Sequence, residues 1–171
     1  MSADYVEIKV PTSLYSYIMH TTGGDTIRLG KNGVLWAVIK QHLICYTRWS
    51  LECNSQMQDT QTPKIRIELL RKNGAQVPNK DFTLNTSSRK YLSLEGNRIV
   101  VRLLISEFQK TFLDYMSGAS MANPQLSIKD AINVFCDDYG LEFLNSYEML
   151  KKRWYRYRQK ESCLQNTLLN L

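Results

Sequence analysis

The sequence predicts an α+β protein: a body with short strands and packed helices, followed by a helical C-terminal unit. Two periodicities carry this prediction. Residues 5–10 and 64–69 alternate apolar and polar side chains, as half-buried strands do, whereas several other segments repeat apolar side chains at helical spacing. Hydrophobic residues form 43% of the 171 residues and charged residues 22%, which is the composition of a folded globular chain.

The first block of the chain is expected to form a strand, a short helix, a brief extended segment over 26–29 and a stronger helix over about 33–46. A hydroxyl side chain, Thr12 or Ser13, is suited to cap the first helix, because such oxygens accept hydrogen bonds from free backbone N–H groups. The glycine pair that starts at Gly23 ends that helix. This block therefore predicts two helices that follow an N-terminal strand.

The second block begins after a polar stretch over 50–63, which has no periodicity and is expected to be a linker or exposed loop. The strand at 64–69 follows, and residues 82–84 are suited to a short returning strand. Ser93 is placed to cap a long helix that ends at 117–118. The body is therefore assigned to residues 1–118.

The third block has the clearest helix signals. Ser127 stands three residues before Asp130, which is close to the capping-box pattern, and Gly140 suits a left-handed helix end. Residues 145–148 carry the start signal of a second helix, which is expected to run from Tyr147 at least to Lys160. We assign residues 125–161 to a basic unit like a helix-turn-helix and residues 162–171 to a tail.

No catalytic residue set is recognisable, and we expect a protein that is not an enzyme. The two histidines, His20 and His42, have no serine, cysteine or carboxylate beside them in a nucleophile arrangement. The four cysteines form no C-x-x-C pair and have no histidine cluster, which argues against a metal site or a disulfide framework. The glycines at 23–24 and 30–33 lack the context of a phosphate-binding loop, so no cofactor is expected.

The protein is expected to be cytoplasmic and to have no membrane partner. Its N-terminal residues lack the basic and apolar regions of a secretory signal. Its longest apolar stretches, such as 99–105, are too short to span a bilayer. A net charge of +6 and a pI near 9.1 favour an anionic partner instead.

Much of that positive charge lies in the last expected helix. With 100° per residue, Leu150 and Trp154 share an apolar stripe. The residues Lys152, Arg156 and Lys160 form a stripe nearly opposite, and Arg153 is expected beside it. One face can then pack inward while the other presents cations to phosphates, with one or two arginines reading bases. The basic residues expected to bind nucleic acid are Lys151, Lys152, Arg153, Arg156, Arg158 and Lys160, and Ser146 and Tyr155 are expected to add contacts.

A capped helix, a turn with a glycine and a second helix with basic residues is the order of a helix-turn-helix. In this organisation residues 125–161 resemble small regulators carried by phages and mobile elements. The resemblance implies a non-enzymatic protein that binds double-stranded DNA, acting as a transcriptional regulator or accessory factor. The connection between the two expected helices is longer than in the tightest such turns.

The N-terminal segment resembles the ribbon-helix-helix repressors, in its strand Val6-Glu-Ile-Lys-Val-Pro11 and the two helical segments after it. In that family two chains pair their strands, so the resemblance implies a homodimer. It implies that Tyr5, Glu7 and Lys9 face DNA and that a phosphate lies near Lys31. Two features depart from the family: the segment between the helices is long, and Glu7 suits DNA poorly.

Other functions remain open at this stage. The basic helix is also suited to docking on an acidic protein, as in an adaptor, a virion-type protein or an inhibitor that occupies a nucleic-acid site. In that case the apolar residues within 164–171 supply a short segment for a protein partner. A basic helix can also be a solvated surface with no partner.

Overall fold

The computed structural model describes residues 5–29, 33–44, 62–69 and 91–168, and side chains up to residue 163. The chain divides into two compact units, Met1–Ile105 (unit 1) and Ser106–Leu171 (unit 2). The division falls inside a long helix, so residues 106–118 group with the C-terminal helices and not with the body to which the sequence assigned them. The fold is α+β, as predicted.

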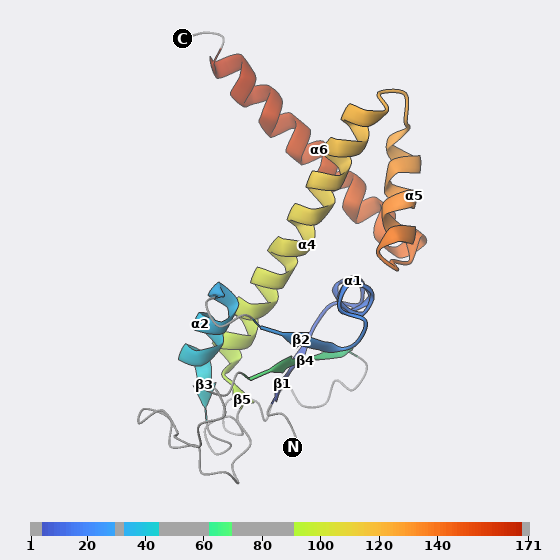
Figure 1. Ribbon diagram of the computed structural model, residues 1–171. Coiled ribbons are helices and arrows are strands. Elements are labelled where there is room, and N and C mark those ends of the chain that lie inside the picture. Colours follow the sequence, from blue (N-terminus) through green and yellow to red (C-terminus); the bar gives the residue numbers. More distant parts are fainter. Residues whose placement is uncertain (1–4, 30–32, 45–61, 70–90, 169–171) are drawn as a thin grey trace. The chain divides into compact units, whose positions relative to one another are not determined.

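Unit 1 holds the strands and the first two helices, coloured blue to green in Figure 1. In chain order its elements are β1 (Tyr5–Lys9), α1 (Thr12–Thr22), β2 (Thr26–Arg28), α2 (Val34–His42), β3 (Leu43–Ile44), β4 (Lys64–Glu68) and β5 (Tyr91–Leu92). The long helix α4 (Leu94–Ala122) begins here and continues into unit 2, which also contains α5 (Ile128–Asp138) and α6 (Phe143–Leu168).

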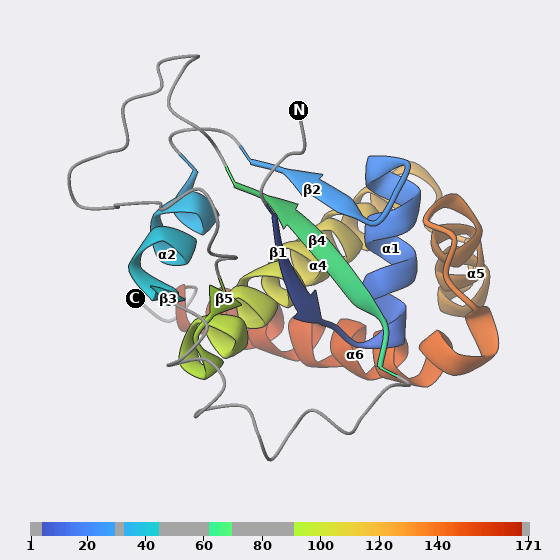
Figure 2. The ribbon, with the colours of Figure 1, turned by 90° about the horizontal axis from the view of Figure 1, so that it is seen from below.

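The larger sheet of unit 1 has β4 in its centre, between β1 and β2 (Figure 2). β1 runs antiparallel to β4 and pairs Val6 with Ile67, whereas β2 runs parallel and pairs Ile27 with the same Ile67. The alternation of apolar and polar residues in the sequence therefore corresponds to the two faces of this sheet. Its buried side chains from β1 and β4 are Val6, Ile8, Ile65 and Ile67.

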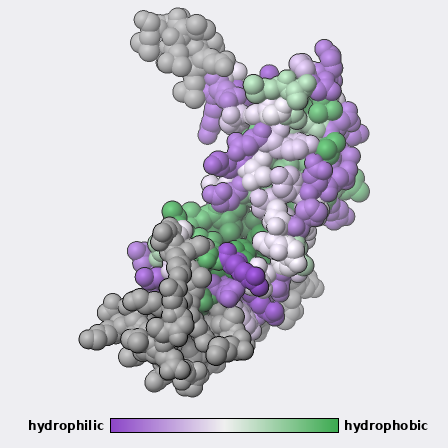
Figure 3. Space-filling model, in the orientation of Figure 1, coloured by the Kyte–Doolittle hydropathy of each residue, from purple (hydrophilic) through white to green (hydrophobic). Residues whose placement is uncertain are grey.

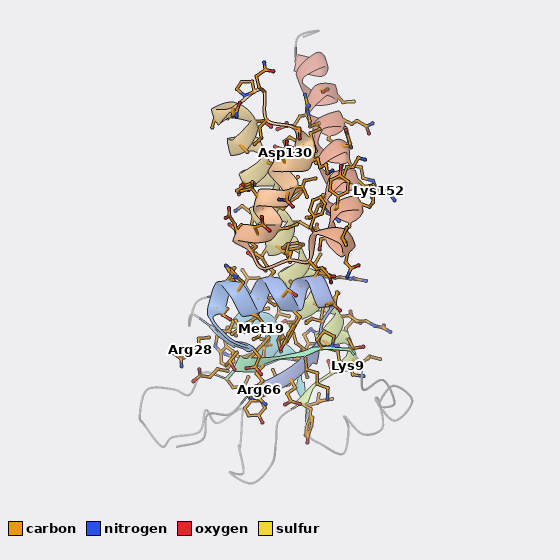
Figure 4. All side chains as sticks on the ribbon, turned by 90° about the vertical axis from the view of Figure 1, so that its right-hand side faces the viewer. Lys9, Met19, Arg28, Arg66, Asp130 and Lys152 are labelled. Carbon is orange, nitrogen blue, oxygen red and sulfur yellow. The ribbon has the colours of Figure 1, made fainter. Side chains whose placement is uncertain are left out.

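The opposite face of this sheet is charged and centred on Arg66 of β4 (Figure 4). Its guanidinium lies 3.7 Å from a carboxylate oxygen of Glu7 and 3.7 Å from one of Asp25, and its Cζ lies 5.2 Å from the centre of the Tyr5 ring. Arg28 pairs with Glu68 at 3.4 Å. Exposed pairs of this kind each contribute only about 0–1 kcal/mol. They do, however, neutralise both arginines of the face.

The start of α4 is fixed by contacts with the end of α2. The backbone N–H of Ser93 donates to the carbonyl of His42 at 2.9 Å, and the Ser93 hydroxyl accepts from the backbone N–H of Gly96 at 3.0 Å. Ser93 thus caps α4, as the sequence predicted. A Cβ at Gly96 would stand 2.4 Å from the Cβ of His42, so only glycine permits this close approach.

Some helix boundaries differ from the predicted ones. The Pro11 residue stands at the start of α1 and no side chain caps that helix, so the expected capping by Thr12 or Ser13 is wrong. The helix expected over 33–46 ends at His42, because β3 pairs with β5 instead. α4 continues to Ala122, beyond the expected end at 117–118, because a glycine in a packed helix costs only about 1 kcal/mol.

Several predicted features lie outside the described residues. They are the returning strand at 82–84, all of the linker over 50–63 except its last two residues, and Lys31.

Unit 2 is built around the ring of Phe135, which is fully buried. α5 runs back alongside the C-terminal part of α4, and α6 crosses α4 (Figure 1). The Phe135 ring lies 5.1 Å from that of Phe112, 5.3 Å from Tyr115 and 6.3 Å from Phe108, as measured between ring centres. All three partners belong to α4. The aromatic cluster therefore fixes α5 against α4.

Both ends of α5 follow the sequence signals. The Ser127 hydroxyl accepts from the backbone N–H of Asp130 at 3.1 Å and donates to its carboxylate at 2.6 Å. Gly140 has a φ of 62°, in the left-handed region that favours glycine. α6 starts at Phe143, slightly before the start signal at 145–148. The capped helix and its glycine end are thus confirmed.

A Gly96→Ala substitution is expected to lower the free energy of unfolding by about 1–3 kcal/mol, because the added methyl group must displace the end of α2. Gly118→Ala in the same helix is the matched control. A Cβ at Gly118 meets nothing within 4 Å, so this change is expected to stabilise the helix by up to about 1 kcal/mol. Denaturant unfolding of both variants measures the difference. Equal effects of the two substitutions would contradict the close approach.

A Phe135→Ala substitution is expected to cost about 3–5 kcal/mol, because it empties the centre of the aromatic cluster. Its neighbour Val134 is 43% exposed, so Val134→Ala is expected to change stability much less. Thermal unfolding followed by circular dichroism compares the two. A small loss for Phe135→Ala would show that the cluster does not hold unit 2 together.

Candidate nucleic-acid interface

α6 has a buried side and a charged side, as the sequence predicted. Leu150 is 1% exposed and Trp154 is 4% exposed, and the Trp154 ring stacks on that of Tyr157 with 5.7 Å between ring centres. This apolar stripe packs inward in unit 2. It turns the opposite side of the helix toward solvent, where Lys152 points outward (Figure 4).

Four of the six predicted basic residues are exposed on α6, and within the described part of the chain none of their side chains has an ion-pair partner. They are Lys152, Arg156, Arg158 and Lys160. Hydrophilic side chains also cover much of the visible surface of unit 2 (Figure 3). The exposure of Lys152, Arg156 and Lys160 agrees with the stripe that the sequence predicted opposite the apolar one, whereas Arg153, expected beside that stripe, is only half exposed.

Arg153 is less exposed than these four cations, because it lies at the border of the buried stripe. Its guanidinium donates a hydrogen bond to the side-chain oxygen of Gln109 on α4. Burial lowers the pKa of Arg153, and the positive charge of Arg156 lowers it further. Arginine stays charged at neutral pH in spite of such a shift. The contact therefore ties α6 to α4 and leaves Arg153 less available to a ligand.

Lys151 is also partly engaged. Its ammonium nitrogen lies 3.8 Å from a carboxylate oxygen of Glu148, one turn before it, and 5.2 Å from the centre of the Tyr147 ring. An exposed ion pair of this kind contributes little and exchanges easily with another anion. Lys151 can therefore turn to a phosphate at small cost.

The two uncharged residues expected at the site have different positions. Tyr155 is 47% exposed and lies on the solvent side of α6. Ser146 is only 3% exposed, so its hydroxyl is not presented beside the cations and the expected contact needs correction. The reason is helical spacing: Ser146 stands four residues before Leu150 and shares its buried stripe.

Of the two secondary contacts expected, Lys9 belongs to the described residues and Lys31 does not. Lys9 is half-buried on β1, in unit 1, on the same sheet face as Glu7 and Arg66. One edge of β1 is occupied by β4 of the same chain, and Glu7 is paired with Arg66. Pairing between two chains would therefore have to use the other edge of β1. The implied homodimer stays a prediction.

The fold brings together one pair that the sequence analysis missed. The Oγ of Ser93 lies 3.4 Å from Nδ1 of His42, although 51 positions separate them. The sequence, in which no serine stands beside His42, gave no sign of this approach. Ser93 is 9% exposed, and its oxygen already accepts the hydrogen bond that caps α4. This arrangement gives the pair a structural use at the junction of α2 and α4.

Metal and membrane features are not found in the described residues. No group of three or more histidine, cysteine or acidic side chains there is arranged to hold a metal ion. None of the helices described, α4 and α6 included, combines the length and apolar character needed to cross a bilayer.

The comparisons with known proteins found no relative. No protein-family model matches the chain, and neither a curated protein nor a solved structure is similar to it.

The two described cysteines are expected to differ in reactivity. Cys136 is fully buried in α5, and burial, with a smaller effect of Asp137, raises the pKa of its thiol to about 11. Cys163 is exposed on α6. Since the thiolate is the reactive form, iodoacetamide at pH 8 is expected to modify Cys163 well before Cys136. Peptide mass spectrometry over a time course measures both rates, and faster labelling of Cys136 would contradict its burial.

Proposed function

We propose that the protein binds double-stranded DNA through the solvent side of α6, and that it acts without catalysis. The observation that carries this proposal is the set of four exposed cations on one helix, none of which has an ion-pair partner in the described part of the chain. They are Lys152, Arg156, Arg158 and Lys160. Exposed guanidinium and ammonium groups of this kind suit a phosphate backbone.

The charge distribution supports the same proposal. The segment from 143 to 168 contains six basic and two acidic residues, which gives it a net charge of +4. By contrast, the arginines on the sheet of unit 1 are paired with carboxylates. Among the helices and strands that the structure describes, α6 therefore offers an anionic polymer the largest excess of positive charge. Release of counterions from DNA would supply much of the affinity, so binding should weaken steeply with salt.

The regulatory part of the proposal rests on the order of the elements. α5 ends at the left-handed Gly140, and α6 follows with the basic residues, in the order of a helix-turn-helix. The resemblance to small regulators of phages and mobile elements implies a transcriptional regulator or accessory factor that works in the cytoplasm. In this role the protein would position itself on DNA and need no cofactor.

A protein partner is the second candidate, and exposed apolar side chains of unit 2 favour it. Leu144 at the start of α6 is 84% exposed, and Met121 near the end of α4 is 85% exposed. An acidic protein that met α6 could bury such side chains as well as pair with the cations. Such an adaptor would bind a protein partner and leave duplex DNA unbound at moderate salt.

Fluorescence anisotropy with a labelled pool of random duplexes tests DNA binding. Changing Lys152, Arg156 and Lys160 together to alanine is expected to weaken binding at least tenfold in low salt. The slope of log affinity against log salt should fall by about three, since each phosphate contact adds about 0.9 to it. The matched control changes Lys40, Lys64 and Arg98 to alanine, which removes the same charge from exposed positions of unit 1.

The control is expected to retain most of the affinity, and both variants should keep the circular dichroism of the unmodified protein. Equal losses in the two triple variants would mean that net charge, and not the α6 surface, drives binding. No binding at the lowest salt would contradict the proposed function and favour the protein partner.

A further inference from the structure

The solvent side of α6 is divided lengthwise into three strips. With 100° per residue from Leu150, Tyr155 and Gln159 lie at about 140° and 180°, in the middle of the solvent side. Lys151 and Arg158 lie at about 80–100° on one flank, and Lys152 and Arg156 at about 200–240° on the other flank. A strip that holds Tyr155, Gln159 and the acidic Glu148 thus lies between two pairs of cations, and Lys152 stands at its border.

The residues of the middle strip are free to meet a ligand. Tyr155 is 47% exposed and Gln159 is exposed, and neither side chain has a hydrogen-bond partner in the part of the chain that the structure describes. Glu148 lies at the N-terminal end of the same strip, where Lys151 compensates its charge at 3.8 Å. The strip therefore offers a phenol and an amide to the surroundings, with cations on both sides.

This arrangement matches the major groove of duplex DNA. The groove is about 12 Å wide and admits one α-helix, whose middle faces the base edges and whose two flanks face the two phosphate backbones. Basic flanks on both sides fit that geometry better than a single basic stripe, which would meet only one backbone.

We propose that α6 lies in the major groove with Tyr155 and Gln159 against the base edges and with cations of both flanks on the two backbones. This inference rests on the proposed function and assigns base reading to these two residues, whereas the sequence analysis assigned it to arginines. The glutamine amide can donate to N7 and accept from the N6 amino group of adenine, as a bidentate pair. The Tyr155 ring suits the thymine methyl group. The site is therefore specific for a duplex with A·T pairs at its centre.

Selection of binding sites from randomised duplexes tests the assignment. The unmodified protein is expected to enrich a site in which one adenine position is preferred by about 5- to 150-fold, the range of one good bidentate contact. Gln159→Ala should remove the preference at that position and leave the salt slope unchanged. Lys152→Ala should instead weaken all sequences by a similar factor and lower the slope by about one.

Gln125→Ala is the matched control, because Gln125 is also exposed but lies between α4 and α5. It should retain the full preference. Binding that depends on the α6 cations but keeps its preference in Gln159→Ala, or has none in the unmodified protein, would overturn this inference alone. Tighter binding to a single strand than to a duplex of equal length would also overturn it. Failure to bind any duplex at low salt would overturn the proposed function as well.

Discussion

The packing of the Phe135 ring against three aromatic side chains of α4 is the contact on which the rest of unit 2 depends. A buried aromatic ring contributes a large apolar area, and its tilted contacts with other rings restrict how the two helices can be aligned. Once α5 is fixed in this way, the short turn at Gly140 leads directly into α6. Leu150 and Trp154 then bury the inner side of α6.

The inner side of α6 determines which of its cations are available to a partner. Arg153 stands beside the buried stripe and is held by Gln109, whereas Lys152 and Arg156 lie on the far side and have no partner in the described residues. A single helix therefore divides its basic residues between holding unit 2 together and facing solvent. The same geometry places Tyr155 and Gln159 between two pairs of cations, and the proposed mode of DNA binding rests on this arrangement.

The local signals of the sequence predicted much of this fold. Alternation identified β1 and β4, and the caps at Ser127 and Gly140 marked the ends of α5, because these features depend on residues close together in the chain. Pairing between distant segments was not predictable in the same way. Leu43 continues the helical pattern of the residues before it, but it lies in a strand and pairs with Leu92. Because Leu92 is far away in the sequence, no local pattern predicts this strand.

The candidate site was predictable to a similar extent. Helical spacing identified the buried stripe and the exposed positions of Lys152, Arg156 and Lys160. The same spacing puts Ser146, four residues before Leu150, on the buried side. The use of Arg153 depended on Gln109 of another helix, and the pair of His42 and Ser93 depended on the meeting of α2 and α4. Neither contact has a sequence pattern of its own.

The central claim is that α6 binds duplex DNA with its solvent side while its other side stays packed. An NMR titration of the ¹⁵N-labelled full chain with a duplex at low salt tests this directly. We expect the largest amide shifts at Lys152, Tyr155, Arg156 and Gln159, with little change around Phe135 and Ile132 in α5. Shifts confined to the sheet of unit 1, or none at any residue of α6, would contradict the claim.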